Sequence, residues 1–454
     1  MNKFFTYIVL LAFGTTSFAQ VAKTGDNQKM NLDAPTANRF SIPQNLVWPN
    51  EIGKANVCLW NDDKLAAATI TIDDNIENNH KWWLSMQDKY DISFTWFIII
   101  GKVSSWDKYQ TLIDAGNEIQ THDLAIAPVV HGDVNSYSDE NYMIDITQAR
   151  DTINKMLTNN ESLTFAYPFG KQKNYISRSK FIAMRGVTGL MNYANKINYL
   201  DVNSRSATND PEDIKRLLDP THKLWNMVFY RGLASYHYHY VAYGSARTKT
   251  EAFLAELSAK SDSIWIGKFS EVTRYGQERD THNLTVDEVG NTSIKFTLTD
   301  QMSDRYFDFP LTVKIRLDNT WEAVKATQNG KVINTTIVEN DGNMYALVKA
   351  IPDKGQVIVS KSEGLGINDI DASDINIYPN PVKGNEINIS LSKSYSTNKT
   401  IDLYDIRGRI VYSSSIEKGT KTHRIYLKNS LTSGIYIIEI GSNNSIVSKK
   451  ILVK

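Results

Sequence analysis

The chain has 454 residues, of which 41% are hydrophobic, so it is long enough to form two or three domains with cores of their own. Lysine and arginine together number 50, as do aspartate and glutamate, and this balance indicates neither a nucleic-acid partner nor an anionic membrane surface. Cys58 is the single cysteine, which excludes an intrachain disulfide and a cysteine-rich zinc site.

The N-terminus has the pattern of a secretory signal. Lys3 gives a positive start, residues 4–13 form an apolar run, and small residues before Gln20 fit a cleavage site. We therefore expect a signal peptide over 1–19 and a polar leader over 20–55. A membrane anchor is the alternative, although the apolar run is short for a bilayer, and the mature chain has no other candidate span.

A run of small and β-branched residues over 66–75 (AAATITIDDN) predicts a buried strand that ends at Asp73 and Asp74. In α/β folds the carboxyl ends of strands face the site, so two adjacent carboxylates there are candidates for catalysis or metal binding. The alternative is an ordinary helix N-cap, for which Asp is a common residue.

Strands and helices alternate over 56–280. The expected strands are 66–73, 92–100, 118–122, 163–167, 187–191, 224–230 and 263–266, and the expected helices are 79–90, 106–115, 138–157, 175–184, 248–258 and 270–279. This alternation predicts an α/β domain with a parallel sheet, a distorted (β/α) barrel of seven strands. Short alternating strands predict two small all-β, sandwich-like domains after it, over 281–362 and 374–454, joined by a linker over 363–373.

Three stretches of the barrel, in order and each at a strand end, resemble the motifs of polysaccharide deacetylases (the NodB-homology group, carbohydrate esterase family 4). They are 71–75 (TIDDN), 116–122 (GNEIQTH) and 165–170 (FAYPFG). The resemblance implies hydrolysis of acetyl groups on a polysaccharide or oligosaccharide, with a divalent cation such as zinc. The cation lowers the pKa of a water molecule, a carboxylate takes its proton, and an acid protonates the leaving group.

The same resemblance implies roles for particular residues. Asp73 would be the catalytic base, and Asp74 and His122 would be metal ligands. The acetyl group would bind against four residues of the third motif, with a backbone N–H near Phe169 holding the oxyanion. These four are Tyr167, Pro168, Phe169 and Gly170.

The sequence departs from the family pattern at two histidines. Ile126 stands where a second metal-binding histidine is expected, four residues after His122. His131 could replace it if an inserted loop brings it to the site, or it could be a plain surface residue. Arg231 stands where a catalytic histidine should follow the predicted strand 224–230.

An alternating aromatic run over 236–240 (YHYHY) offers substitutes for the missing groups. In an extended segment His237 and His239 share one face and could supply the acid or a ligand. The alternative is a substrate-facing or lid loop without proton chemistry, in which Tyr236 and Tyr238 would contact a sugar.

Residues over 374–454 resemble the type IX secretion sorting domain of Bacteroidetes. The matching stretches are 377–381 (IYPNP), 403–409 (LYDIRGR), 433–436 (SGIY) and 449–454 (KKILVK). The resemblance implies the secretion machinery as a partner and export through both membranes, followed by release or attachment to the cell surface. A generic β-sandwich module is the alternative.

The leading hypothesis is therefore a secreted, metal-dependent deacetylase of an acetylated polysaccharide. A glycoside hydrolase that uses the Asp pair on the same barrel is a second hypothesis. A surface protein that binds glycans without catalysis is a third, favoured by Ile126 and Arg231.

Overall fold

The computed structural model describes residues 46–126, 131, 137–206, 209–362, 375–382, 384–391, 398–405, 409–427, 431–442 and 445–453. The predicted signal peptide, most of the predicted leader and the predicted linker lie outside these residues. The chain forms two compact units, one made of the barrel and the middle sandwich and the other of the C-terminal sandwich. Among the described helices, none has the length and hydropathy needed to cross a membrane.

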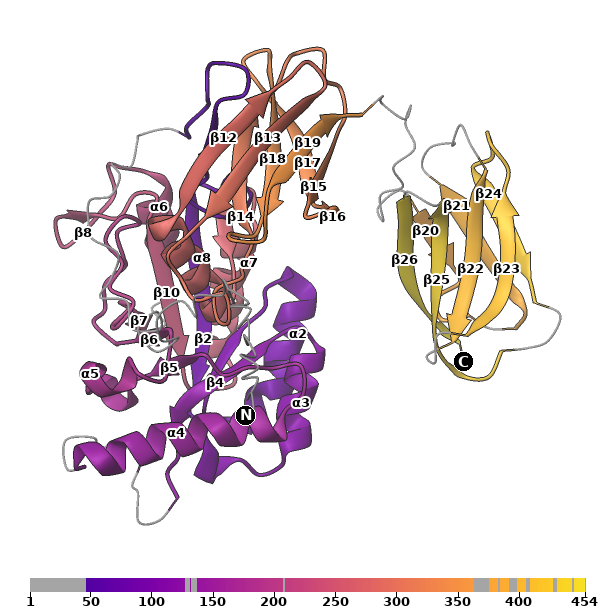
Figure 1. Ribbon diagram of the computed structural model, residues 1–454. Coiled ribbons are helices and arrows are strands. Elements are labelled where there is room, and N and C mark those ends of the chain that lie inside the picture. The colour runs from indigo at the N-terminus through magenta and orange to yellow at the C-terminus, as the bar shows by residue number, and fades with distance from the viewer. Residues whose placement is uncertain are drawn as a thin grey trace, which may run out of the picture. The chain divides into compact units, whose positions relative to one another are not determined.

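A parallel sheet of eight strands forms the barrel, in the order β6-β5-β4-β3-β2-β10-β7 with β11 beside β2 (Figure 1). The strands are β2 (Ala66–Asp73), β3 (Thr95–Ile99), β4 (Glu118–Asp123), β5 (Thr164–Ala166), β6 (Ala183–Arg185), β7 (Arg205–Ser206), β10 (Leu233–Tyr238) and β11 (Ile264–Ile266). A bridge from Arg185 to Val202 links β6 to the segment before β7, so the curled sheet nearly closes.

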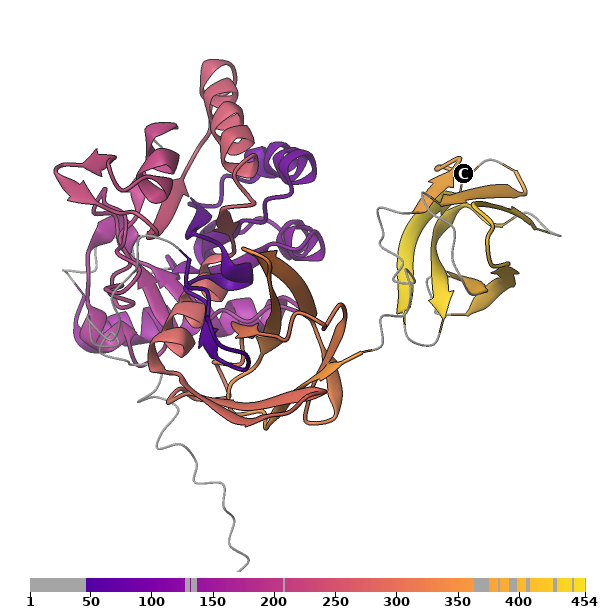
Figure 2. The same ribbon diagram turned by 90° about the horizontal axis from the view of Figure 1, so that it is seen from above.

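Helices surround the curled sheet, as the view from above shows (Figure 2). They are α2 (His80–Tyr90), α3 (Trp106–Asp114), α4 (Asp139–Met156), α5 (Asn174–Ser177), α6 (Glu212–Leu218), α7 (Ser245–Ser258) and α8 (Phe269–Thr281). Every residue of β2 is buried, as expected for a parallel strand covered on both faces. The predicted α/β class is confirmed for this part of the chain.

The end of β2 is fixed by a turn that directs its two carboxylates. Asp74 and Asn75 have φ angles of 68° and 51°, which turn the backbone sharply out of the strand. The Asn75 side chain accepts a hydrogen bond from the N–H of Ile99 at 2.6 Å and donates to the carbonyl of Ile99 at 3.0 Å. This clamp aligns the carboxyl ends of β2 and β3.

Three predictions for the second half of the barrel are wrong. Helix α5 covers only the beginning of the predicted helix 175–184, and the strand that follows is β6 rather than 187–191. Residues 224–230 form a small antiparallel hairpin of β8 (Lys223–Leu224) and β9 (Met227–Val228) instead of a barrel strand. The hairpin forms because Trp225 and Asn226 both have positive φ, and the barrel strand is β10.

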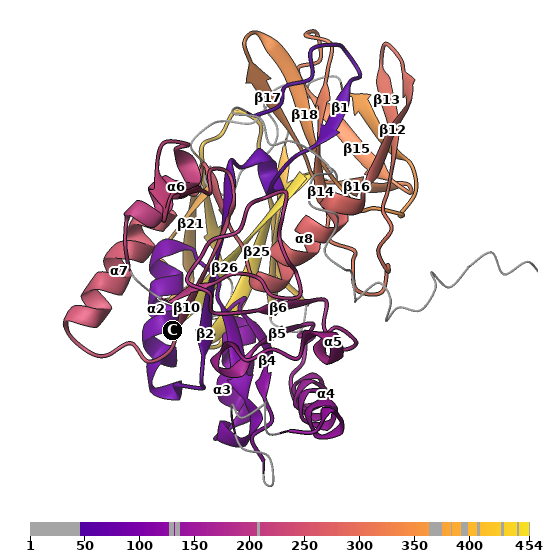
Figure 3. The ribbon, with the colours of Figure 1, turned by 90° about the vertical axis from the view of Figure 1, so that its left-hand side faces the viewer.

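The middle sandwich consists of two antiparallel sheets, β1-β14-β18-β17 and β12-β13-β19-β15-β16. Its strands are β1 (Ala55–Val57), β12 (Asn283–Val289), β13 (Ser293–Thr299), β14 (Leu311–Arg316), β15 (Val324–Gln328), β16 (Lys331–Ile333), β17 (Thr335–Asn340), β18 (Asn343–Ala350) and β19 (Val357–Lys361). Strand β1 precedes the barrel in sequence but pairs with β14. Helix α8 packs on β14 and joins the sandwich to the barrel (Figure 3).

The C-terminal unit is a second sandwich, with sheets β20-β21-β24 and β23-β22-β25-β26. Its strands are β20 (Ile375–Tyr378), β21 (Glu386–Leu391), β22 (Lys399–Asp405), β23 (Ile410–Ile416), β24 (Thr422–Tyr426), β25 (Gly434–Ser442) and β26 (Ser445–Val453). Buried apolar side chains from both sheets, among them Ile387, Leu403 and Ile438, form its core. The predicted antiparallel domains after the barrel are confirmed.

The buried His80 at the start of α2 makes the stability of the barrel depend on pH. Its ring packs against Trp96 and Tyr109, and burial lowers its pKa from 6.5 to about 4. The unfolded chain therefore binds more protons between these values, so stability falls as the pH falls. Relative to His80→Leu, the wild type should lose about 2 kcal/mol of unfolding free energy between pH 7 and pH 5 in urea titrations. An equal loss in both proteins would contradict this.

Candidate functional site

Three potential metal ligands meet at the carboxyl ends of β2 and β4. The Oδ1 atom of Asp74 lies 3.6 Å from Nε2 of His122 and 3.7 Å from Nε2 of His131. All three ligand atoms lie within 4.8 Å of one another. Two ligands at about 2.1 Å from a tetrahedral ion are about 3.4 Å apart, so the spacing fits a small divalent cation.

Hydrogen bonds orient both imidazole rings toward this point. Nδ1 of His122 donates to the carbonyl of Ala166 at 2.8 Å, and Nδ1 of His131 donates to Oδ2 of Asp123 at 2.6 Å. In a neutral ring Nε2 then carries a lone pair, and burial lowers the pKa of His122 and so favours its neutral form. Among the described residues, Oδ1 of Asp74 has no hydrogen-bond partner. Three electron-pair donors therefore converge, which is the chemistry of a cation site.

The neighbouring Asp73 is buried and paired with an arginine from another strand. Nη2 of Arg185, the last residue of β6, donates to Oδ2 of Asp73 at 2.5 Å. Burial raises the pKa of Asp73, but Arg185 and nearby histidines outweigh burial, and the net pKa lies below its usual value. Its other oxygen, Oδ1, is buried with no hydrogen-bond partner among the described residues. Asp73 is thus a charged carboxylate with one oxygen available to a ligand.

Strand β10 carries His237, and His239 follows directly after its last residue, so both lie at the same end of the barrel. Nε2 of His239 lies 3.8 Å from Oδ2 of Asp73 and 3.9 Å from Oδ2 of Asp74, and this side chain is 49% exposed. His237 is buried, and burial together with Arg185 lowers its pKa to about 3. The predicted sharing of one face by the two rings agrees with their centroid separation of 5.8 Å.

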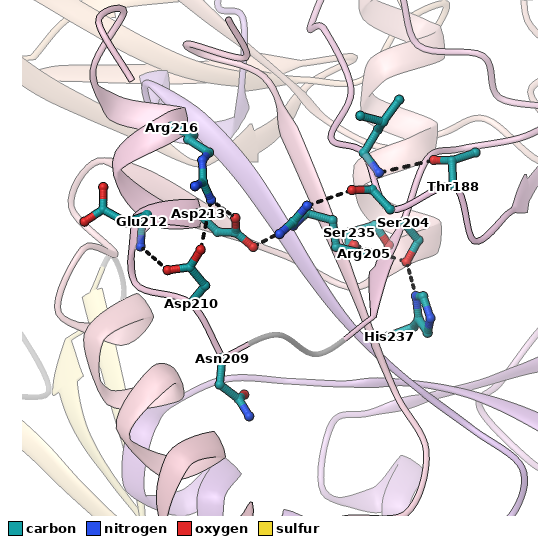
Figure 4. A network of polar contacts seen from close by, with 12 residues as sticks. Thr188, Ser204, Arg205, Asn209, Asp210, Glu212, Asp213, Arg216, Ser235 and His237 are labelled. Carbon is teal, nitrogen blue, oxygen red and sulfur yellow. Dashed lines mark hydrogen bonds and ion pairs between the residues drawn. The ribbon is translucent and has the colours of Figure 1, made fainter. Parts of the chain in front are cut away.

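A polar network beside β10, from the segment that includes β7, fixes the ring of His237 (Figure 4). Oγ of Ser204 donates to the carbonyl of Ser235 at 3.1 Å and contacts Nδ1 of His237 at 2.7 Å. The hydroxyl therefore accepts the Nδ1–H of His237, which leaves Nε2 as the nitrogen with a lone pair. The adjacent Arg205 binds Asp213 of α6 at 2.7 Å, and this buried ion pair ties β7 to its helix.

Alternation along β10 directs its tyrosines away from the acidic pair and corrects the role predicted for Tyr236. Because His237 faces the site, Tyr236 and Tyr238 point to the opposite face and are buried there. Tyr236 packs on Phe253 of α7, and the Tyr238 hydroxyl donates to Asn209 at 2.9 Å. Tyr236 is therefore not placed to contact a sugar, whereas Tyr238 is among the residues that line an open cavity together with His237 and His239.

The predicted catalytic position of Arg231 is also wrong. Leu233 pairs with Ala67 at the beginning of β2, so Arg231 lies at the amino ends of the strands, away from Asp73. Its carbonyl accepts a hydrogen bond from Nε1 of Trp60 at 2.8 Å. The shift follows from the misplaced strand, because a residue after 224–230 would otherwise have reached the site.

The third motif lies beside the histidines, but its residues differ in accessibility. Tyr167 is buried, and its hydroxyl donates to the carbonyl of Leu200 at 3.0 Å. Its side chain therefore packs in the interior and has a structural role. Pro168 is also buried, whereas Phe169 is 71% exposed and its ring lies 5.4 Å from that of His131. Gly170 has a φ of 67° and packs against Val187. Phe169 is therefore the member of the motif with an exposed side chain, and Gly170 is partly exposed.

Sequence reasoning missed a pair of buried aspartates next to His131. Asp123 ends β4, and Asp145 of α4 contacts its side chain and accepts a hydrogen bond from the Leu124 N–H at 3.0 Å. Burial and the charge of Asp123 raise the pKa of Asp145 to about 8. The sequence offered one signal for this pair, because Asp123 directly follows His122, a candidate metal ligand.

Two parts of the chain match family models. Residues 61–185 match the family described as polysaccharide deacetylase, and residues 376–454 match the one described as secretion system C-terminal sorting domain. The chain thus carries a polysaccharide deacetylase domain and ends in a secretion-system sorting domain, and both predicted resemblances are confirmed. The sorting domain implies secretion or placement at the cell surface.

Individual proteins are similar to parts of the chain. A gellan lyase from a Bacillus species is 36% identical over 359 residues, or 73% of this chain, and the match spans 14% of the length of that protein. The peptidoglycan deacetylase PdaC from Bacillus subtilis shares 17% identity and a TM-score of 0.31, over 46% of this chain and 90% of its own. A family 4 acetyl xylan esterase from Clostridium thermocellum, in complex with a cobalt ion, shares 15% identity and a TM-score of 0.32, over 45% and 89%.

Removing Arg185 should destabilise the barrel strongly, because it leaves the buried charge of Asp73 uncompensated. We expect Arg185→Met to cost about 3–5 kcal/mol of unfolding free energy in urea. Arg305→Met breaks an exposed ion pair with Glu161 and should cost at most about 1 kcal/mol. Adding Asp73→Asn to Arg185→Met should recover part of the loss. Equal costs for the two arginine variants would contradict the buried pair.

Proposed function

We propose that the barrel is a hydrolase that removes acetyl groups from a polysaccharide outside the cell, with a divalent cation, zinc being the best match to the ligands. The observation that carries the proposal is the convergence of Asp74, His122 and His131 through three lone-pair atoms beside the paired Asp73. Two imidazoles and a carboxylate suit zinc and similar ions. When bound, such an ion supplies an activated water molecule and polarises the acetyl carbonyl.

Asp73 is the proposed general base. Its Oδ1 is free of hydrogen bonds from the described residues, while Arg185 holds Oδ2 and keeps the group charged. A charged carboxylate held in this way can accept a proton from water at the point where the ligand atoms meet. Arg185 is the residue that fixes its orientation.

His239 is the proposed proton donor to the leaving group. Its Nε2 lies within 4 Å of both carboxylates, at 3.8 Å and 3.9 Å, and its ring lines an open cavity of about 240 Å³. Tyr240 and Thr250 line the same cavity, which gives the sugar that carries the acetyl group a place to bind. The low pKa of His237 keeps that ring neutral, so we assign it a hydrogen-bonding role.

Export and substrate class belong to the same proposal. The C-terminal sorting domain, together with the predicted signal peptide, supports export by the type IX route followed by release or surface attachment. The name of the gellan lyase adds gellan to the polysaccharides to be assayed. The similarity covers a small part of that protein. The assay should therefore also detect lyase and glycosidase products.

The test is release of acetate from a panel of acetylated polysaccharides by the full-length protein loaded with zinc or cobalt. Asp73→Asn should reduce kcat by about 10²–10⁴-fold, because the base is lost. Asp88→Asn, on the exposed face of α2, is the matched control and should leave kcat unchanged. New reducing ends or unsaturated products without acetate would indicate glycosidase or lyase chemistry instead. Glycan binding that persists in Asp73→Asn, with no acetate from either protein, would indicate a non-catalytic binder.

The assignment of His239 predicts a dependence on the leaving group. His239→Ala should slow acetate release from sugar esters by about 10²-fold, because an alkoxide leaves poorly without a proton donor. The same variant should hydrolyse 4-nitrophenyl acetate nearly as fast as the wild type, since nitrophenolate needs no proton. His237→Gln is the comparison and should affect both substrates alike. Equal loss on both substrates in His239→Ala would contradict the assignment.

A further inference from the structure

His131 lies on a loop, nine residues after His122, and outside any described helix or strand. The position four residues after His122 is occupied by Ile126, whose side chain is exposed and cannot bind a metal. A ligand on a loop keeps its geometry only if its own side chain is fixed by neighbours. The residues that fix His131 are therefore as necessary to the site as the ligand itself.

The ring of His131 is held on three sides. Its Nδ1 donates to Oδ2 of Asp123 at 2.6 Å, and its ring centroid lies 5.4 Å from that of Phe169 and 5.4 Å from that of His122. The hydrogen bond is charge-assisted and short, so it contributes most to orientation. It points Nε2 toward Asp74 at 3.7 Å.

Asp123 itself is anchored in the rigid part of the barrel. It is the last residue of β4, its side chain is buried, and its Oδ1 accepts a hydrogen bond from the Ala125 N–H at 3.3 Å. Asp145 from the middle of α4 touches the same carboxylate and binds the Leu124 N–H at 3.0 Å. A helix and a strand thus support a ligand that neither of them carries.

We propose that Asp123 and Asp145 are positioning residues that convert the loop histidine His131 into a metal ligand. This inference rests on the proposed function, since it concerns the same cation site. Asp123 acts by accepting the Nδ1–H of His131, and Asp145 acts by holding the Asp123 carboxylate and the backbone after it. Neither residue touches the cation or the reacting atoms.

The test is metal affinity of the full-length protein, measured by zinc competition with a chromophoric chelator and by the visible spectrum of the cobalt form. Asp123→Ala should weaken binding by about 10–100-fold and lower the intensity of the cobalt bands, as loss of an orienting partner does. Asp145→Leu should weaken binding in the same direction. Asp145→Asn keeps a hydrogen-bond donor and an acceptor in a side chain of the same shape. Its zinc affinity should therefore lie within about 3-fold of that of the wild type.

A double variant separates this inference from the proposed function. If Asp123 acts through His131, Asp123→Ala should add no loss of affinity in a His131→Ala background. A further 10-fold loss there, or wild-type affinity in folded Asp123→Ala, would overturn the inference while leaving the cation site intact. Asp123→Asn, close to isosteric, extends the comparison if the alanine variant does not fold, with the same expected direction. Absence of zinc binding by the wild type would overturn the proposed function instead.

Discussion

The register between β2 and β10 is the constraint on which the site depends. Thr71 pairs with His237 and Ile72 with Tyr238, so the end of β10 lies beside the acidic pair. Because side chains alternate along a strand, a shift of one residue would direct tyrosines at Asp73 and bury the histidines among the helices. The cluster of aromatic side chains behind β10, including Trp83 and Phe253, opposes such a shift.

Within this frame, charge and hydrogen bonding give two adjacent aspartates different roles. Asp73 is buried against Arg185, whereas Asp74 follows it in a left-handed turn and is directed at two histidines. The turn at Asp74 therefore separates the carboxylate of Asp73, which is paired with Arg185, from the carboxylate of Asp74, which lies beside the ring nitrogens of His122 and His131. Environment, more than sequence position, decides what each carboxylate can do.

The local part of this arrangement could be predicted from the sequence. The run before Asp73 consists of small and β-branched residues, and Ile119 and Thr121 alternate with polar residues before His122, so both strands are predicted close to their observed bounds. Strand β10 was missed because Ser235 and His237 face the site and give it the composition of a loop, while the more apolar 224–230 forms a hairpin. The partner of Asp73 could not be foreseen, because Arg185 is 112 residues away and only the folded sheet brings them together.

The pairing of β1 with β14 means that the barrel is an insertion within the sandwich. The chain leaves the sandwich after β1 and returns to it at β12, so the two are joined by two covalent connections. Tyr275 and Arg279 of α8 also bind the carbonyls of Cys58 and Leu59, each at 2.8 Å, next to the first connection. Rotation about a single linker is thereby excluded, and during synthesis the sheet that begins with β1 can be completed only after the whole barrel has emerged.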